Sequence, residues 1–220
     1  QAAGLKAPTT HNLLATLVNL GYATRAPAGR CYRLGARSLA LGTGKSLLAR
    51  LTHAGRGPSR RLADASGETV ILAVDVADQR HSVLCCESRQ QLSVRAETGI
   101  DDHYYDTATG RMLLALRSPE SSVEIIRVHG LPGAVWPAAD GERGLRQCLQ
   151  GIRTADQVEL SKTSSHVRAL AVPIRLQSVP VGASLGLFYP TARDASGRME
   201  YLLQQLHVAA ADIEVAYERV

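Results

Sequence analysis

The first 60 residues contain no aspartate and no glutamate, and the first acidic side chain of the chain is Asp64. The same stretch holds nine lysines and arginines, so it carries +9 of a whole-chain net charge of +5 and leaves −4 for the remainder. A segment without carboxylates does not repel phosphate, and it releases counterions on binding it, which favours nucleic acid over an acidic small molecule. The segregation of charge therefore predicts two domains with different partners.

Long apolar runs are also missing. The longest ones are too short to cross a bilayer, so we expect neither a membrane span nor a membrane partner. The N-terminal residues lack the charged-then-apolar layout of a signal peptide, which predicts a cytoplasmic protein. With 45% hydrophobic and 20% charged residues, the composition is that of an ordinary globular protein.

The four cysteines, Cys31, Cys85, Cys86 and Cys148, form no CxxC pair and have no histidine at metal-ligand spacing. We therefore interpret them as small buried hydrophobes and expect no metal and no cofactor. Redox sensing by the adjacent Cys85 and Cys86 stays open as an alternative.

Motifs of known catalytic chemistry are absent too: there is no nucleophile elbow, P-loop, dinucleotide glycine motif or zinc signature. We therefore predict no catalytic residues. A small-molecule enzyme and a DNA-free sensor module remain the alternatives. The residues available for an enzyme are Cys85, Cys86, Asp101, Asp102, His103 and Asp106.

What is present begins with a helix and a hairpin. Leucines recur at helical spacing over Thr9–Leu20 (Leu13, Leu14, Leu17 and Leu20), which predicts an amphipathic helix that buries this face. The β-prone runs Tyr22–Arg25 and Arg30–Leu34 follow, with turn residues between them. A polar-faced helix followed by an arginine-bearing hairpin is typical of a winged helix, with the helix in the major groove and the wing on the backbone.

The remainder predicts a helix that links the domains and then an α/β sheet of antiparallel or mixed order. The linking helix covers about residues 36–52, with a second start at Lys45. The other expected elements are strands at 66–76, 81–88, 169–176 and 182–189, helices at 109–117, 121–129 and 141–152, and a terminal helix with a face of Leu202, Leu206, Ala210, Ile213 and Tyr217. Residues 77–80 should form the turn of a hairpin.

Three stretches resemble the IclR family of bacterial regulators, in order and over nearly the whole chain. HNLLATLVNLGYATRAPAGRCYRLGARSLALG is similar to the family's recognition helix, wing and start of the linker helix. SGETVILAVDV resembles the opening strand of its sensor domain. DTATGRMLLA, with RALAVPIR and GASLGLFYP, resembles the turn into a helix and the later strand pair.

The resemblance implies an α+β fold of two domains. A winged helix-turn-helix DNA-binding domain is expected over residues 1–36, a linker helix over 37–53 and an effector-binding domain over 54–220. The effector-binding domain should be GAF-like α/β with an antiparallel or mixed sheet. Family members have one or two more helices before the point where this sequence begins, so the winged domain is expected to be N-terminally truncated.

The resemblance also implies the partners. These are double-stranded operator DNA, a small organic acid and further copies of the chain in a homodimer or homotetramer. The acid is expected to be an aromatic acid or a short oxo-acid, and repression and activation both stay open.

Candidate site residues follow from this layout. Residues that begin the helix or carry charge on the hairpin are expected to contact DNA: Lys6, Thr9, Thr10, His11, Asn12, Arg25, Arg30 and Arg33. Residues around the turn into the helix at 109–117, whose free N–H groups suit a carboxylate, and on the later strands are expected to contact the effector. They are Gly99, Ile100, Tyr104, Tyr105, Thr107, Ala108, Gly110, Glu159, Ala169, Ser184 and Gly186.

Three positions depart from the family's pattern. The recognition helix usually carries arginine where this chain has Asn12, which shifts the expected base preference from guanine towards adenine. A Pro-Leu-His pattern is here His103, Tyr104 and Tyr105, and a cysteine of some members is Ala169. These changes alter the expected pocket wall, so no known effector is transferred to this chain.

Overall fold

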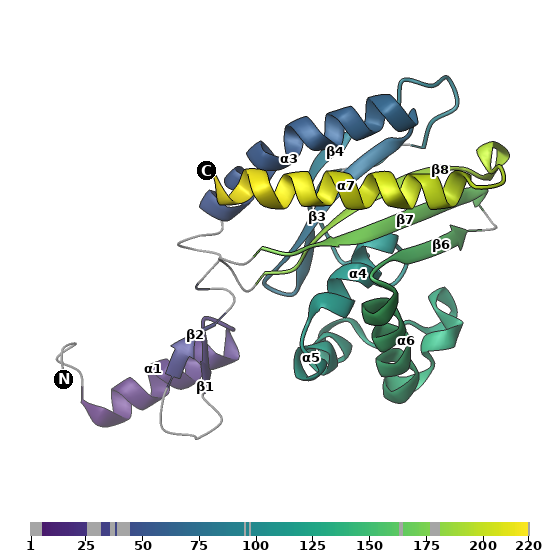
Figure 1. Cartoon of the computed structure of the whole chain (residues 1–220). Helices are drawn as coiled ribbons and strands as arrows, with labels where there is room; N and C mark the ends of the chain where they lie inside the picture. The colour runs from purple at the N-terminus through teal and green to yellow at the C-terminus, as the bar shows by residue number, and fades with distance from the viewer. Residues whose placement is uncertain are drawn as a thin grey trace. The chain divides into compact units, whose positions relative to one another are not determined.

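The computed structural model describes residues 6–25, 32–35, 38, 45–94, 96, 98–162, 165–176 and 181–219. The chain forms two compact units, Gln1–Ala49 and Arg50–Val220. Figure 1 shows the elements of both along the chain. No helix within the described ranges is long and apolar enough to cross a membrane.

The first unit contains the expected helix and hairpin. Helix α1 (Ala7–Asn19) has a proline in its first turn, where the missing N–H costs no hydrogen bond. Gly21, with a φ of +73°, turns the chain out of the helix. Strand β1 (Ala23–Arg25) then pairs antiparallel with β2 (Tyr32–Leu34).

The leucine face of α1 differs from the prediction. Leu13, Leu17 and Leu20 are 48%, 40% and 46% exposed, so the expectation that this face is buried was wrong for the chain as described. Helical periodicity identifies the apolar side of a helix, but burial also needs a second element to cover it. In the described part of this unit, the short β1–β2 hairpin leaves those side chains accessible.

The second unit is built on one six-stranded sheet. Its order is β5-β4-β3-β8-β7-β6, and every neighbouring pair is antiparallel. The strands are β3 (Thr69–Val76), β4 (Gln79–Cys86), β5 (Gly99–Asp101), β6 (Val158–Lys162), β7 (Val167–Ile174) and β8 (Ala183–Pro190). The predicted α+β fold with an antiparallel sheet is thus confirmed.

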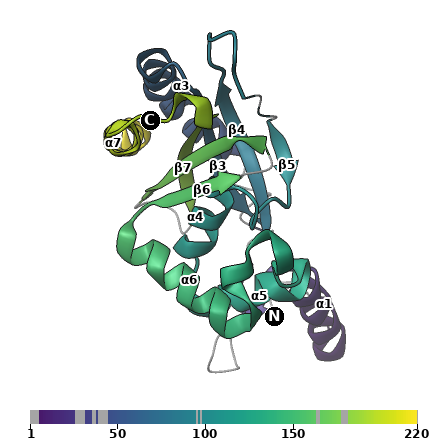
Figure 2. The same cartoon turned by 90° about the vertical axis from the view of Figure 1, so that its right-hand side faces the viewer.

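Helices cover both faces of this sheet (Figure 1, Figure 2). Helices α3 (Lys45–Ser66) and α7 (Arg198–Glu218) lie on one face, while α4 (Ala108–Leu116), α5 (Pro119–His129) and α6 (Gly141–Ala155) lie on the other. The short 3-10 turns η2 (Gly133–Val135) and η3 (Pro137–Ala139) connect α5 to α6, and η5 (Thr191–Arg193) precedes α7. The predicted inner face of the terminal helix, from Leu202 to Tyr217, is buried.

The β3–β4 hairpin is tighter than predicted. Ala77 and Asp78 both have positive φ angles, of 53° and 61°, as a two-residue hairpin turn requires, and Gln79 already belongs to β4. The alternation of β3 places neighbouring side chains on opposite faces of the sheet. Leu72 faces α3, where a Cβ at Gly55 would lie 2.5 Å from its Cδ2 atom, whereas Ile71 faces a cavity on the α4 side.

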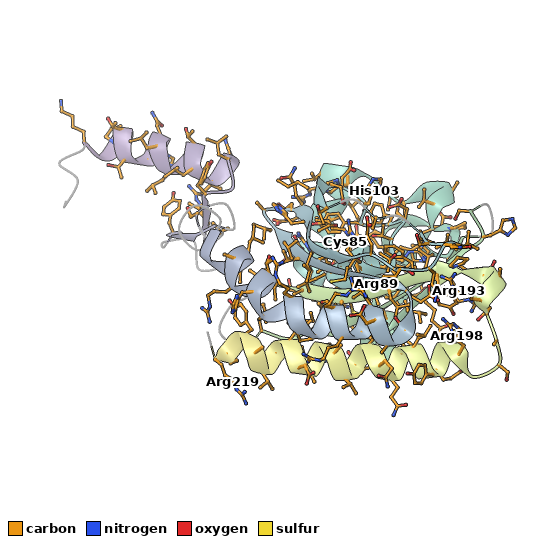
Figure 3. All side chains as sticks on the ribbon, turned by 90° about the horizontal axis from the view of Figure 1, so that it is seen from above. Cys85, Arg89, His103, Arg193, Arg198 and Arg219 are labelled. Atoms are coloured by element: carbon orange, nitrogen blue, oxygen red, sulfur yellow. The ribbon has the colours of Figure 1, made fainter. Side chains whose placement is uncertain are left out.

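A buried carboxylate joins the start of β3 to the last helix. Glu68 is 1% exposed and pairs with Arg193 and with Arg198, whose Nη2 atom lies 2.6 Å from the Glu68 Oε1. Figure 3 shows both arginines at the same end of α7. Arg193 also donates a hydrogen bond of 2.7 Å to the backbone oxygen of Leu92. The irregular segment after β4 is thereby fixed over the sheet.

Candidate functional site

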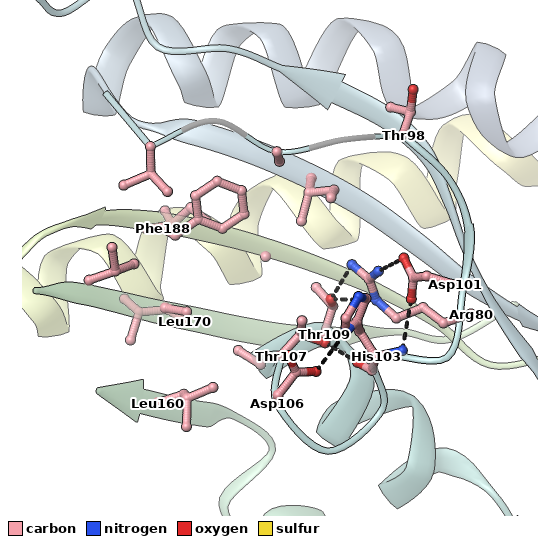
Figure 4. A pocket seen from close by; sticks show the side chains of 18 of the residues that line it. Arg80, Thr98, Asp101, His103, Asp106, Thr107, Thr109, Leu160, Leu170 and Phe188 are labelled. Carbon is pink, nitrogen blue, oxygen red and sulfur yellow. Dashed lines mark hydrogen bonds and ion pairs between the residues drawn. The ribbon is translucent and has the colours of Figure 1, made fainter. Parts of the chain in front are cut away.

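A cavity of about 460 Å³ lies between the sheet and the N-terminus of α4. All six strands contribute to its wall, together with the segment before β5 and the turn that leads into α4. A volume of this size suits a small organic ligand. Figure 4 shows that the two ends of the cavity differ in chemistry.

One end is apolar. Leu160, Leu170 and Phe188 gather there, and Phe188 is the single phenylalanine of the chain. Its ring is half-buried. This end can hold the hydrocarbon part of a ligand but makes few directional contacts.

The other end is polar and centres on Arg80 of β4. Arg80 is 4% exposed. Its Nη1 atom lies 2.5 Å from Oδ2 of Asp101, and its Nε and Nη2 atoms donate to the hydroxyl of Thr109 at 3.2 and 3.1 Å. The partners fix the guanidinium in the wall, because a buried charge without partners would be strongly unfavourable.

His103 and Asp106 complete this polar end (Figure 4). The His103 Nδ1 atom lies 3.2 Å from Oδ1 of Asp106, and the His103 backbone N–H donates to Oδ1 of Asp101 at 3.0 Å. Asp101 therefore connects the arginine to the turn that carries the histidine.

The start of α4 adds backbone donors. Thr107 caps the helix by accepting a hydrogen bond of 3.1 Å from the N–H of Gly110. Ala108 and Thr109 line the cavity, and the first N–H groups of a helix have no acceptor within it. Together with the helix dipole, they favour an anionic group at this point.

Two glycines allow the close packing that shapes this end. A Cβ at Gly110 would lie 2.3 Å from the backbone oxygen of His103, and one at Gly186 would lie 2.6 Å from Cγ2 of Thr109. Any larger residue would push α4 away from the turn or from the sheet. Gly186 therefore lets the helix N-terminus approach the cavity.

Comparison with known proteins identifies the family. The family description "Bacterial transcriptional regulator IclR C-terminal" matches residues 45–215, and "IclR helix-turn-helix domain" matches residues 1–27. The chain belongs to the IclR family. It is a DNA-binding transcriptional regulator, as the resemblance in the sequence predicted.

Named relatives and solved IclR structures agree. The HTH-type transcriptional regulator KdgR of Escherichia coli (strain K12) is 24% identical over 206 residues, which cover 93% of this chain and 78% of KdgR. The crystal structure of an IclR homologue from Microbacterium hydrocarbonoxydans, complexed with 4-hydroxybenzoate, has 26% identity and a TM-score of 0.66, covering 99% of this chain and 88% of that one. The Thermotoga maritima IclR structure, at 18% identity and a TM-score of 0.67, shares the fold over 98% of this chain and 87% of its own.

The structure brings six of the eleven expected effector-contact residues of this IclR protein to the cavity wall. They are Gly99, Ile100, Thr107, Ala108, Ala169 and Gly186. Five others are not among the described residues that line the cavity: Tyr104, Tyr105, Gly110, Glu159 and Ser184. Gly110 is next to the wall and shapes it indirectly through its contact with His103.

The two tyrosines make other contacts. Tyr104 is fully buried, and its hydroxyl donates to Oδ1 of Asp75 at 2.9 Å. Tyr105 donates to the backbone oxygen of Gly130 at 2.7 Å, and burial raises the pKa of its hydroxyl. Both hydroxyls are therefore used within the protein.

Glu159 and Ser184 also have protein partners. Glu159 is exposed on β6, and its Oε1 accepts a hydrogen bond of 3.3 Å from the side chain of Gln157. Ser184 is fully buried and donates to the backbone oxygen of Val172 at 3.0 Å.

Sequence reasoning missed Arg80 and Thr109 and did not select Phe188. Arg80 gave no local signal, because its neighbours Gln79 and His81 are also polar and the run 77–80 predicted a turn. Asp101, His103 and Asp106 were considered only as material for an enzyme, yet they line this cavity.

Cys85 and Cys86, which the sequence offered for redox sensing or catalysis, lie on β4. Burial raises the pKa of Cys85 to about 11, with the negative charge of Glu87 as a smaller cause. Burial raises the pKa of Cys86 as well. Both groups are thiols at neutral pH, whereas the thiolate is the reactive form.

In the winged domain, the expected DNA contacts gather at the start of α1. Lys6, Thr9, His11 and Asn12 are exposed there, and Thr10 donates to the backbone oxygen of Lys6 at 3.1 Å.

The hairpin supplies the remaining expected contacts. The Nη2 atom of Arg25 donates to the hydroxyl of Tyr32 at 3.1 Å, and its guanidinium lies 5.6 Å from the centre of that ring. Arg33 belongs to β2, but its side chain lies outside the described part, as does all of Arg30.

Proposed function

We propose that this IclR-family regulator binds a small organic acid in the cavity and that binding changes its affinity for operator DNA. The observation that carries the proposal is the combination, at one end of the cavity, of the buried Arg80 with the N-terminus of α4. Both favour an anion. The Microbacterium hydrocarbonoxydans homologue, which holds 4-hydroxybenzoate, supports an acid as the ligand class. The protein would act in the cytoplasm, where operator DNA lies, and bind the acid without turnover.

The proposed DNA contacts have two roles. Thr9, Thr10, His11 and Asn12, at the exposed start of α1, would reach base edges, where asparagine pairs best with adenine. Charged residues would hold phosphates and set the register: Lys6, Arg25, Arg30 and Arg33.

We place the winged domain at residues 1–36, the linker helix at 37–53 and the effector-binding domain at 54–220. Ligand binding would be coupled to DNA binding through the linker helix. In a homodimer or homotetramer, ligand in the cavity would change the spacing of two winged domains. The effect on operator affinity equals the ligand's differential affinity for the two spacings, on the order of 1–3 kcal/mol.

The decisive experiment is fluorescence anisotropy of the full-length protein on DNA from upstream of its own gene, across a salt series. We expect sequence-selective binding that weakens with salt and that at least one carboxylic acid shifts. Binding that is indifferent to sequence and to every acid would overturn the proposal.

Two variants distinguish base contacts from phosphate contacts. Asn12→Ala should cost about 1–3 kcal/mol on the preferred operator and relax its specificity, whereas Arg25→Ala should weaken binding to all sequences and reduce the salt slope by about 1. Arg219→Ala removes the same charge as Arg25→Ala, but from an exposed position that belongs to the other unit. It should leave the affinity unchanged.

A further inference from the structure

Arg80 is the only lysine or arginine among the described residues that line the cavity. It reaches the wall from β4, in the middle of the polar end (Figure 4). Its three contacts, one to Asp101 and two to Thr109, use three of the five N–H groups of a guanidinium. Among the described contacts, two N–H groups are left for a ligand.

The charges around Arg80 limit what it can hold. Asp101 and Asp106 line the same end, so two carboxylates stand against one guanidinium. Asp101 is in direct contact with the arginine at 2.5 Å. One incoming carboxylate can use the free N–H groups and the start of α4. A second would add negative charge where carboxylates already outnumber the arginine.

The opposite end selects the body of the ligand. Phe188 offers a half-buried ring, and Leu160 and Leu170 lie beside it. A short oxo-acid would reach Arg80 but leave this apolar surface without contacts. A ring-sized apolar body fills it, and burial of that surface contributes affinity in proportion to area.

We infer that Arg80 is the carboxylate anchor of the cavity and that Asp101 restricts the ligand to one carboxylate. The effector is then a monocarboxylic acid with an apolar body about the size of an aromatic ring. This inference rests on the proposed acid-sensing function. It adds the charge and the size of the ligand and names Arg80 and Asp101 as the residues that select it.

The first test is calorimetry on the full-length protein with benzoate, phthalate, pyruvate and benzamide as probes. Benzoate should bind about tenfold or more tightly than phthalate, which adds a second carboxylate beside the first at the polar end, and than benzamide, which removes the charge. Pyruvate should also bind more weakly than benzoate. Equal or tighter binding of phthalate or pyruvate would overturn the inference while leaving acid sensing intact.

The second test removes the restriction. Asp101→Asn should reduce the preference for benzoate over phthalate to within about threefold, because the competing charge is gone. Asp102→Asn is the matched control: it removes one charge from the adjacent, exposed carboxylate and should keep the preference of the wild type. An unchanged preference in Asp101→Asn would contradict the role assigned to Asp101.

The third test removes the anchor. The double variant Arg80→Gln with Asp101→Asn avoids a buried unpaired carboxylate, and it should bind benzoate no better than benzamide. Arg80→Lys keeps the charge and serves as a second variant if the double variant does not fold. It should retain a reduced preference for benzoate, since a lysine makes fewer fixed hydrogen bonds.

The outcomes separate the two proposals. If the wild type binds an acid and the Arg80 variants bind it equally well, the anchor is wrong and acid sensing stands. If the wild type binds none of the acids, the proposed function fails and the inference fails with it.

Discussion

The hydroxyl of Tyr104 donates a 2.9 Å hydrogen bond to the Asp75 carboxylate, 29 residues earlier in the chain. Arg117 binds the same carboxylate, with its Nη2 atom 2.6 Å from Oδ1. Burial, and then the negative charge of Asp75, raise the pKa of the tyrosine hydroxyl, which stays protonated and can only donate to the carboxylate. A residue that resembled a ligand contact therefore fastens the turn before α4 to the end of β3.

We expect Tyr104→Phe to lower the free energy of unfolding by about 1–2 kcal/mol, because it removes a hydrogen bond to a charged group. Selectivity among ligands should not change. Urea denaturation and calorimetry measure the two quantities. Tyr105→Phe, which loses only the bond to the Gly130 backbone, should cost less. A loss of binding in Tyr104→Phe at unchanged stability would instead indicate contact with the ligand.

Glu68→Gln should lower the free energy of unfolding by about 2 kcal/mol, since Arg193 and Arg198 would lose their shared charge partner. The value is below that of a fully buried pair because the two arginines are 24% and 27% exposed. Glu142→Gln, in an exposed pair with Arg146, is the control and should cost under about 0.5 kcal/mol. Equal effects in chemical denaturation would contradict the burial argument.

Gly110→Ala and Gly151→Ala should have opposite effects on stability. At Gly110 the new methyl group would lie 2.3 Å from the backbone oxygen of His103, so we expect a loss of about 2 kcal/mol or more. At Gly151, inside α6, nothing lies within 4 Å, and alanine should add about 0.5–1 kcal/mol. Thermal melts distinguish them, and a tolerated Gly110→Ala would mean that the turn readily rearranges.

Iodoacetamide should alkylate Cys85 slowly at pH 8. The rate should still be rising with pH at about pH 9.5. The pKa of Cys85 is raised from 9.0 to about 11, so the thiolate fraction at pH 8 is about a hundredfold below that of an ordinary thiol. Peptide mass spectrometry measures the rate, with the urea-unfolded chain as reference. A rate that levels off below pH 8 would revive redox sensing.

Periodicity and turn residues predicted the long elements well, because α4, α6, α7 and the β3–β4 and β7–β8 pairs each have an apolar pattern of their own. The edge strands β5 and β6 were missed. β5 has only three residues, and β6 is a short strand with few apolar side chains. Helix α3 continues past its expected end through Gly55 and Pro58 to Ser66, since packing against β3 outweighs the local cost of those residues.

The cavity was harder to predict than the fold. The turn into α4 was found because it has a local signature, and Thr107 and Ala108 do line the cavity. Arg80, Asp101 and Phe188 meet only through the sheet, so no short window of sequence shows their proximity. Tyr104 and Ser184 show the opposite case, since local pattern cannot reveal that a polar group already has a partner within the protein.

The pairing of β3 with β8 also sets when the cavity can form during synthesis. β3 lies at the centre of the sheet beside β8, a strand made more than a hundred residues later. During translation, one edge of β3 and one edge of β7 stay unpaired until Ala183–Pro190 has been synthesised. Such late pairing of distant strands slows folding. A nascent or prematurely ended chain that lacks β8 would have no Phe188 wall and no complete cavity. The cavity would be a property of finished molecules alone.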